Sequence, residues 1–139
     1  MRIPKEEEVR LDCVRQKIIE EISKQIDEIL PFDRFMDIAL YTHKYGYYEK
    51  LGKIFGKFGD FTTAPEMGNL FAKCIQNEVE NVLQQIGGNF YELGAGSGRL
   101  SKTILECSSR FQLDYAPNFN IIERSVNLTK VQKRLLGCD

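Results

Sequence analysis

The stretch Phe90-Tyr91-Glu92-Leu93-Gly94-Ala95-Gly96-Ser97-Gly98 decides the fold of this chain. Its first four residues are short, aromatic-rich and bounded by glycines, which predicts a β-strand. The apolar spacing of Arg99–Cys107 predicts a helix directly after it. The glycines between them let the backbone turn tightly and bring a ligand close to the exposed amides of the helix start.

This loop is neither of two common nucleotide-binding motifs. The dinucleotide fingerprint GxGxxG would need glycine where Arg99 stands, and a phosphate loop would need Gly-Lys-Ser/Thr. A second predicted strand, Phe119–Glu123, ends in a carboxylate that can accept the hydroxyls of a ribose. A glycine loop alone is often structural, but strand, loop, helix, strand and terminal acid together favour a nucleotide-type ligand.

The chain is predicted to be mostly helical before the first strand and βαβα from Phe90 onward. A helix after Ser125 closes the second half. Residues 1–86 are expected to form a helical cap with a loop rich in glycine and aromatic residues on the substrate side, and 87–139 the start of a Rossmann-like domain. In the cap we expect a helix from Leu11 that ends before Pro31, and then a short helix N-capped by Asp33. An ordered loop is expected over 44–64. A further helix is expected to begin at a Thr63/Glu66 capping box and to end at Gly87-Gly88.

Composition excludes several classes of function. The 139 residues include 19 Lys+Arg and 20 Asp+Glu, a net charge of -1, so the basic excess that nucleic-acid binding needs is missing. No apolar run is long enough to span a membrane, and the acidic start Met1–Glu8 predicts a cytoplasmic protein. The 4 cysteines form no CxxC pair and only 1 histidine is present, so we expect reduced structural thiols and no metal site.

The loop and the acid that follows it resemble motif I and the next acidic position of class I S-adenosylmethionine-dependent methyltransferases. The resemblance implies S-adenosylmethionine as the cofactor. It places Glu92 near the ammonium group of the cofactor and Glu123 on its ribose diol. The residues that pack against the methionine part would be Gly94, Ala95, Gly96 and Gly98.

Two upstream strings narrow the family. They are Phe35–Tyr41 running into Tyr45-Gly46-Tyr47-Tyr48, and Gly59-Asp60-Phe61-Thr62-Thr63-Ala64-Pro65-Glu66. From about Pro31 to Leu136 the chain is similar to the methyltransferase family of the mitochondrial complex I assembly factor and its bacterial, MidA-like relatives. That resemblance implies protein-arginine methylation of a complex I subunit, and a mitochondrial matrix location if the source is eukaryotic. His43, which stands where the family usually has proline, is not expected in the site.

The upstream strings also supply candidates for the reacting centre. We expect Tyr47, Tyr48 and Phe61, with Thr62 beside them, to line a pocket for the sulfonium, since cations are attracted to aromatic faces. The other interpretation is that these aromatics anchor a core. Asp60 and Glu66 are the catalytic candidates: each could orient a guanidinium, and one could take the proton released on methylation.

The number of strands is smaller than the resemblance implies. Class I methyltransferases use a sheet of about seven strands, whereas this sequence predicts two, and a two-stranded sheet is marginal. We therefore expect a fragment or truncated gene product, inactive by itself, that can self-associate through an open sheet edge. The rival function is a non-catalytic homologue that binds another protein or acts as an assembly partner.

Overall fold

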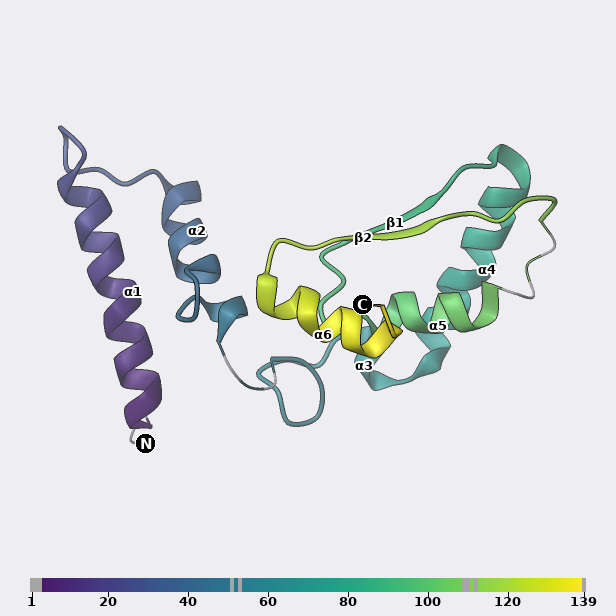
Figure 1. Ribbon diagram of the computed structural model, residues 1–139, viewed down its shortest axis with the longest axis horizontal. Helices are drawn as coiled ribbons and strands as arrows, with labels where there is room; N and C mark the ends of the chain where they lie inside the picture. The colour runs from purple at the N-terminus through teal and green to yellow at the C-terminus, as the bar shows by residue number, and fades with distance from the viewer. Residues whose placement is uncertain (1–3, 51, 53, 109–110, 112, 139) are drawn as a thin grey trace. The chain divides into compact units, whose positions relative to one another are not determined.

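The computed structural model describes residues 4–50, 52, 54–108, 111 and 113–138. The chain forms two compact units, Met1–Leu51 and Gly52–Asp139. Helices before the glycine loop pack with those after it and belong to the same compact unit. The division between residues 86 and 87, into a cap and a Rossmann-like domain, stays a prediction. The elements are α1 (Lys5–Ser23), α2 (Phe32–Tyr41), the 3-10 helix η1 (Tyr47–Glu49), α3 (Ala64–Met67), α4 (Asn69–Ile86), β1 (Phe90–Leu93), α5 (Arg99–Ser108), β2 (Phe119–Ile122) and α6 (Val126–Leu136) (Figure 1).

In the first unit, α1 packs against α2 around Val14 and Ile38. The prediction that the first helix continues almost to Pro31 is wrong: α1 ends at Ser23, and a turn follows. Ile26 and Ile29 are exposed, so the apolar pattern there is not buried and does not stabilise further helical turns. Asp33 is not an N-cap either, because it lies in the first turn of α2 and Pro31 occupies the cap position.

A carboxylate joins the two helices of the first unit. Glu21, near the end of α1, forms ion pairs with Lys24 at 2.6 Å and with Arg34 of α2 at 3.3 Å. The hydrogen bond from Lys24, followed by the one from Arg34, lowers the pKa of the Glu21 carboxyl. The end of α1 is thus tied to the start of α2 by charge.

In the second unit, the helix predicted after Thr63 is divided in two. The chain is extended at Gly68, with φ +156° and ψ 177°, which separates α3 from α4. The predicted capping box is wrong: Thr63 precedes α3 without a side-chain capping bond, and only its carbonyl accepts from the Glu66 amide, at 2.8 Å. The end of α4 is as predicted, since Gly87 follows Ile86 with φ +67°.

The strands β1 and β2 are parallel, with Phe90 opposite Phe119 and Leu93 opposite Ile122. Their order along the chain, with α5 between them and α6 after them, confirms the predicted Rossmann-like βαβα. Figure 1 shows α5 and α6 on the same side of the strands. Ile104 of α5 is fully buried there.

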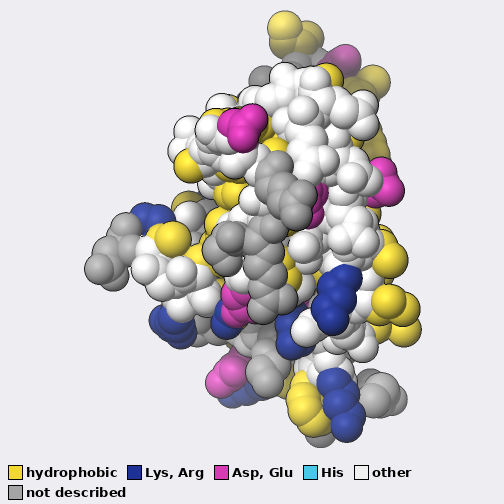
Figure 2. Space-filling view, turned by 90° about the vertical axis from the view of Figure 1, so that its right-hand side faces the viewer, with side chains coloured by type: hydrophobic (Ala, Val, Ile, Leu, Met, Phe, Trp, Pro, Cys, Tyr) yellow, Lys and Arg dark blue, Asp and Glu magenta, His cyan; other side chains and the backbone are white. Residues whose placement is uncertain are grey.

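The opposite face of the strand pair is open. Tyr91, Leu93 and Ile122 are 57%, 74% and 56% exposed, and successive strand residues alternate between faces, so these three share one. Figure 2 shows hydrophobic side chains at the surface, some of them beside Lys and Arg side chains. Parallel sheets are normally covered on both faces, so this face is unusually accessible.

Two findings bear on the predicted class of protein. All four cysteines lie in the described part of the chain as free thiols, and two of them, Cys74 and Cys138, are exposed rather than part of the core. Among the helices described, none has the length and apolar content needed to cross a membrane.

We predict that Ile104→Ala lowers the free energy of unfolding by about 2–5 kcal/mol, because it removes a fully buried side chain and leaves a cavity under the strands. The matched control is Ile86→Ala, at a position 79% exposed, which should change stability by less than about 0.5 kcal/mol. Urea denaturation followed by circular dichroism measures both. Equal effects of the two substitutions would contradict the assigned core.

Candidate functional site

The glycine loop leaves β1 in a backbone conformation that favours glycine. Gly94, Gly96 and Gly98 have φ values of +66°, +56° and +84°. The Gly94 amide donates to the Ile122 carbonyl at 2.9 Å, and the Gly98 amide donates to the Ala95 carbonyl at 2.8 Å. These bonds fix the loop to β2 at one end and close its turn at the other.

The three glycines differ in the space beside them. A Cβ on Gly96 would lie 3.3 Å from the Phe55 ring, and one on Gly98 would lie 3.2 Å from Gln132 Cγ. A Cβ on Gly94 would meet no atom of the described residues within 4 Å. A ligand can therefore approach the backbone at Gly94, while Gly96 and Gly98 are packed against the protein.

Glu92, in β1 two residues before the loop, is held by a serine that no sequence motif indicated. The hydroxyl of Ser101 in α5 donates to the Glu92 carboxylate, and Ser101 is buried. The sequence feature that could have indicated Ser101 is a polar residue on the apolar face of the helix that follows the glycine loop. The bond fixes a negative charge beside the loop.

Glu123 follows β2 and lies beside the loop, as predicted. Its Oε1 accepts from the Ser125 amide at 2.9 Å, and its Oε2 accepts from Gln132 Nε2 at 3.0 Å. The same Gln132 nitrogen donates to the Gly96 carbonyl at 3.0 Å. Gln132 therefore joins the two halves of the predicted cofactor site, and the sequence analysis missed it.

The second upstream string, which starts at Gly59, is brought to the glycine loop by a closed turn over residues 54–61. The amides of Asp60 and Phe61 both donate to the Ile54 carbonyl, at 2.8 and 3.1 Å, and the Phe61 carbonyl accepts from Gly56 at 2.9 Å. The rings of Phe55 and Phe61 lie 6.0 Å apart, and Phe55 also faces Gly96. The turn thus presents one aromatic ring to the loop.

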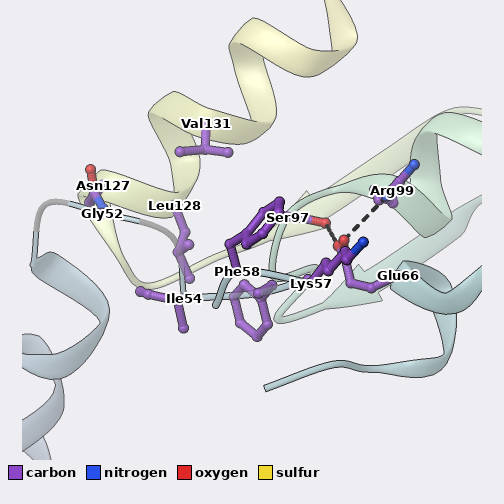
Figure 3. Close-up of a pocket in the computed structure, with 12 residues that line it drawn as sticks. Gly52, Ile54, Lys57, Phe58, Glu66, Ser97, Arg99, Asn127, Leu128 and Val131 are labelled. Atoms are coloured by element: carbon purple, nitrogen blue, oxygen red, sulfur yellow. Dashed lines mark hydrogen bonds and ion pairs between the residues drawn. The ribbon is translucent and has the colours of Figure 1, made fainter. Parts of the chain in front are cut away.

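Glu66 lies against the glycine loop. Its side chain is 8% exposed; Oε1 accepts from the Ser97 hydroxyl, and Oε2 lies 3.3 Å from the Arg99 guanidinium, at the start of α5 (Figure 3). The acid predicted to cap α3 therefore connects the upstream string to the loop.

Glu66, Ser97 and Arg99 line a cleft of about 400 Å³, whereas Glu92, Gly94 and Glu123 are not among its lining residues. Ile54, Leu128 and Val131 form an apolar part, and Glu66 and Arg99 a charged part (Figure 3). Of the two catalytic candidates, Glu66 lines this cleft. Asp60, Phe61 and Thr62 are exposed and are not among its lining residues.

Tyr47 and Tyr48 belong to the first unit. Their rings meet edge to face at 5.2 Å, and Tyr48 also lies 5.7 Å from Tyr41. The Lys50 ammonium lies 4.4 Å from the centre of the Tyr47 ring, so this ring already has a cation over one face. Their contact with a cofactor stays a prediction.

The described residues contain no group of three or more His, Cys, Asp and Glu placed to hold a metal ion. The charged groups around the loop instead pair with one another and with hydroxyls and amides. The arrangement is suited to an organic ligand with charged and hydroxyl groups.

Comparison with known sequences identifies relatives of this chain. Residues 70–139 match the family described as "Putative S-adenosyl-L-methionine-dependent methyltransferase". The Drosophila melanogaster protein arginine methyltransferase NDUFAF7 homologue, named as mitochondrial, is 28% identical over 107 residues, which are 74% of this chain and 24% of that protein. The Caenorhabditis elegans homologue of the same name is 31% identical over 96 residues, 66% of this chain and 22% of that protein.

Solved structures of similar fold also include a protein bound to a product of S-adenosylmethionine. A Burkholderia thailandensis protein bound to S-adenosyl-homocysteine superposes with a TM-score of 0.81 at 28% identity, over 99% of this chain and 36% of its own. A native crystal structure from the same organism and superfamily superposes with a TM-score of 0.74 at 28% identity, over 99% and 34%.

The chain thus spans about a quarter of the curated relatives and about a third of the solved chains. The family match covers half of the chain, residues 70–139, and includes the glycine loop and Glu123. As its motifs predicted, the chain belongs to this family of S-adenosyl-L-methionine-dependent methyltransferases.

Proposed function

We propose that this chain binds S-adenosylmethionine at the glycine loop and is part of a methyltransferase that acts on protein arginine. The observation that carries the cofactor site is the open backbone at Gly94 beside two carboxylates, Glu92 and Glu123, each held in place by hydrogen bonds. The start of α5 favours the carboxylate of the cofactor, and Glu92 favours its ammonium group. Glu123 accepts the ribose hydroxyls.

The bound cofactor supplies an electrophilic methyl group on a sulfonium. The contribution of the protein is to align the acceptor with that methyl group and to exclude water, since positioning alone lowers a barrier by several kcal/mol, on the order of 7–11 at most. Tyr47, Tyr48, Phe61 and Thr62 are proposed to surround the sulfonium. Of these, Phe61 packs on the Phe55 ring that faces the loop.

The cleft supports arginine as the acceptor. Glu66 is a largely buried carboxylate, oriented by Ser97, that already has a guanidinium, that of Arg99, beside it. A carboxylate of this kind orients a planar guanidinium and can take the proton released when the nitrogen is methylated. We propose Glu66 for this role and Asp60, in the neighbouring turn, as a second acid.

The curated relatives support the finer parts of the proposal. Both are named as protein arginine methyltransferases and as mitochondrial, which favours a protein substrate and a mitochondrial location over the cytoplasm. The resemblance to the complex I assembly factor makes a respiratory complex I subunit the acceptor to test first.

A second candidate function is protein binding without catalysis. The observation that favours it is the open sheet face formed by Tyr91, Leu93 and Ile122. Exposed apolar surface of this kind marks sites of association, either with a partner or with a second copy of the chain.

We predict that Gly96→Val abolishes binding of S-adenosyl-homocysteine and that Glu123→Ala weakens it by about 1–3 kcal/mol, the range for a lost bond to a charged group. Valine at position 96 would be strained at φ +56° and would press on Phe55. Gly137→Val is the matched control, because Gly137 has φ +69° and no described atom within 4 Å of a Cβ. Calorimetric titration measures each affinity; equal affinities in wild type and the two site variants would contradict the assignment.

The role of Glu66 is tested with ethylguanidinium, a small mimic of the acceptor, in an NMR titration of the chain. We expect Arg99→Ala to strengthen its binding at least about threefold, because the internal guanidinium no longer competes for the carboxylate. Glu66→Gln should abolish it. Arg134→Ala, which removes an exposed arginine from α6, is the control and should leave binding unchanged. If Asp60→Asn rather than Glu66→Gln removes binding, Asp60 holds the acceptor.

We further predict that the purified 139-residue chain transfers no methyl group to arginine peptides. One face of its strand pair is open to water at Leu93 and Ile122, next to the cofactor loop, so the reacting centre is not enclosed. Transfer of tritiated methyl groups to peptides provides the measurement. Turnover by the monomeric chain would refute this prediction and place a complete site within these residues.

A further inference from the structure

Gln132 is a polar side chain at a buried position. It lies on α6 one turn after Leu128, on the side of the helix that faces the rest of the unit, and only 3% of the residue is exposed. A Cβ on Gly98 would lie 3.2 Å from its Cγ, so the aliphatic part of Gln132 packs against the glycine loop. A buried amide in such a place is costly unless its hydrogen bonds are made.

Those bonds both go to parts of the cofactor site. The Nε2 atom donates to the Gly96 carbonyl at 3.0 Å and to Glu123 Oε2 at 3.0 Å. Both partners are acceptors, so the amide presents its nitrogen to them and uses both of its N–H groups. A single side chain thus fixes the distance between the loop and the acid.

The bond also sets the orientation of the Glu123 carboxylate. Oε1 is held by the Ser125 amide at 2.9 Å, and Oε2 by Gln132. With one bond on each oxygen the carboxylate cannot rotate freely, yet a carboxylate has about four acceptor positions, so each oxygen can still receive a hydroxyl. The carboxylate is therefore oriented so that its two oxygens can accept hydrogen bonds from two adjacent hydroxyl groups.

We propose that Gln132 is a positioning residue for recognition of the ribose diol, acting through Glu123 and the Gly96 carbonyl. The inference rests on the proposed cofactor site and adds to it a residue that selects for the diol. Loss of the amide would release the carboxylate and leave the Gly96 carbonyl without this donor. Affinity for a ligand with both hydroxyls would then fall more than affinity for a ligand that lacks one.

The experiment is calorimetry on the 139-residue chain with two probes, S-adenosyl-homocysteine and its 2′-deoxyribose analogue. We expect wild type to prefer the diol probe by roughly tenfold, the order expected for the loss of one hydrogen bond to a charged group. Gln132→Met, of similar length, should reduce this preference to about twofold while leaving affinity for the deoxy analogue within about threefold. Gln132→Leu also removes the donors, without adding a charge beside Glu123, and should reduce the preference at least as far.

Gln85→Met is the matched control, an exposed glutamine on α4, and should retain the wild-type preference. Urea denaturation confirms that each variant folds, and Gln132→Leu serves if Gln132→Met does not. A tenfold preference that persists in a folded Gln132 variant, or an equal loss of affinity for both probes, would overturn the positioning role. Failure of wild type to bind either probe would instead overturn the proposed cofactor site, and this inference with it.

Discussion

The hydrogen bond from the Gly94 amide to the Ile122 carbonyl extends the pairing of β1 and β2 by one residue beyond the strands. This bond is the constraint on which the site depends, because it starts the glycine loop directly beside the end of β2. Glu123 follows at once and lies within reach of the loop. Parallel pairing brings the carboxyl ends of the two strands to one edge, where ligands bind in open α/β sheets.

A second constraint comes from the residues that pack against the loop. Phe55 presses on Gly96 from one side, and Gln132 packs on Gly98 from α6. The left-handed backbone of the loop is therefore held by side chains from elements far apart in sequence. Preorganisation of this kind lowers the cost of ordering the site when a ligand binds.

The sequence predicted the parts of the fold that depend on local patterns. The two strands, the glycine loop, the helix after Ser125 and the glycine that ends α4 are each visible in a few neighbouring residues. The Ser125 hydroxyl accepts from the Leu128 amide at 3.0 Å, the short-range bond of a helix N-cap. The position of Glu123 beside the loop was predictable because parallel strands bring their carboxyl ends to the same edge of the sheet.

Interactions between distant residues were not predictable in the same way. Glu66 stands where a capping box would place it, yet its carboxylate binds Ser97 and Arg99, more than 30 residues away. Gln132 lies in a predicted helix, but nothing in that helical pattern shows that its amide donates to the Gly96 carbonyl. The end of α1 was also missed, since an apolar spacing at Ile26 does not show whether a partner surface exists to bury it.

The central claim is that the glycine loop and Glu123 form one cofactor site. It is tested most directly by an NMR titration of the ¹⁵N-labelled chain with S-adenosyl-homocysteine, which follows every backbone amide. The account predicts that the largest shifts fall on Gly94 to Gly98 and on Glu123 to Ser125, and that they saturate together with one affinity. Shifts confined to other parts of the chain, or the absence of any saturable shift, would contradict it.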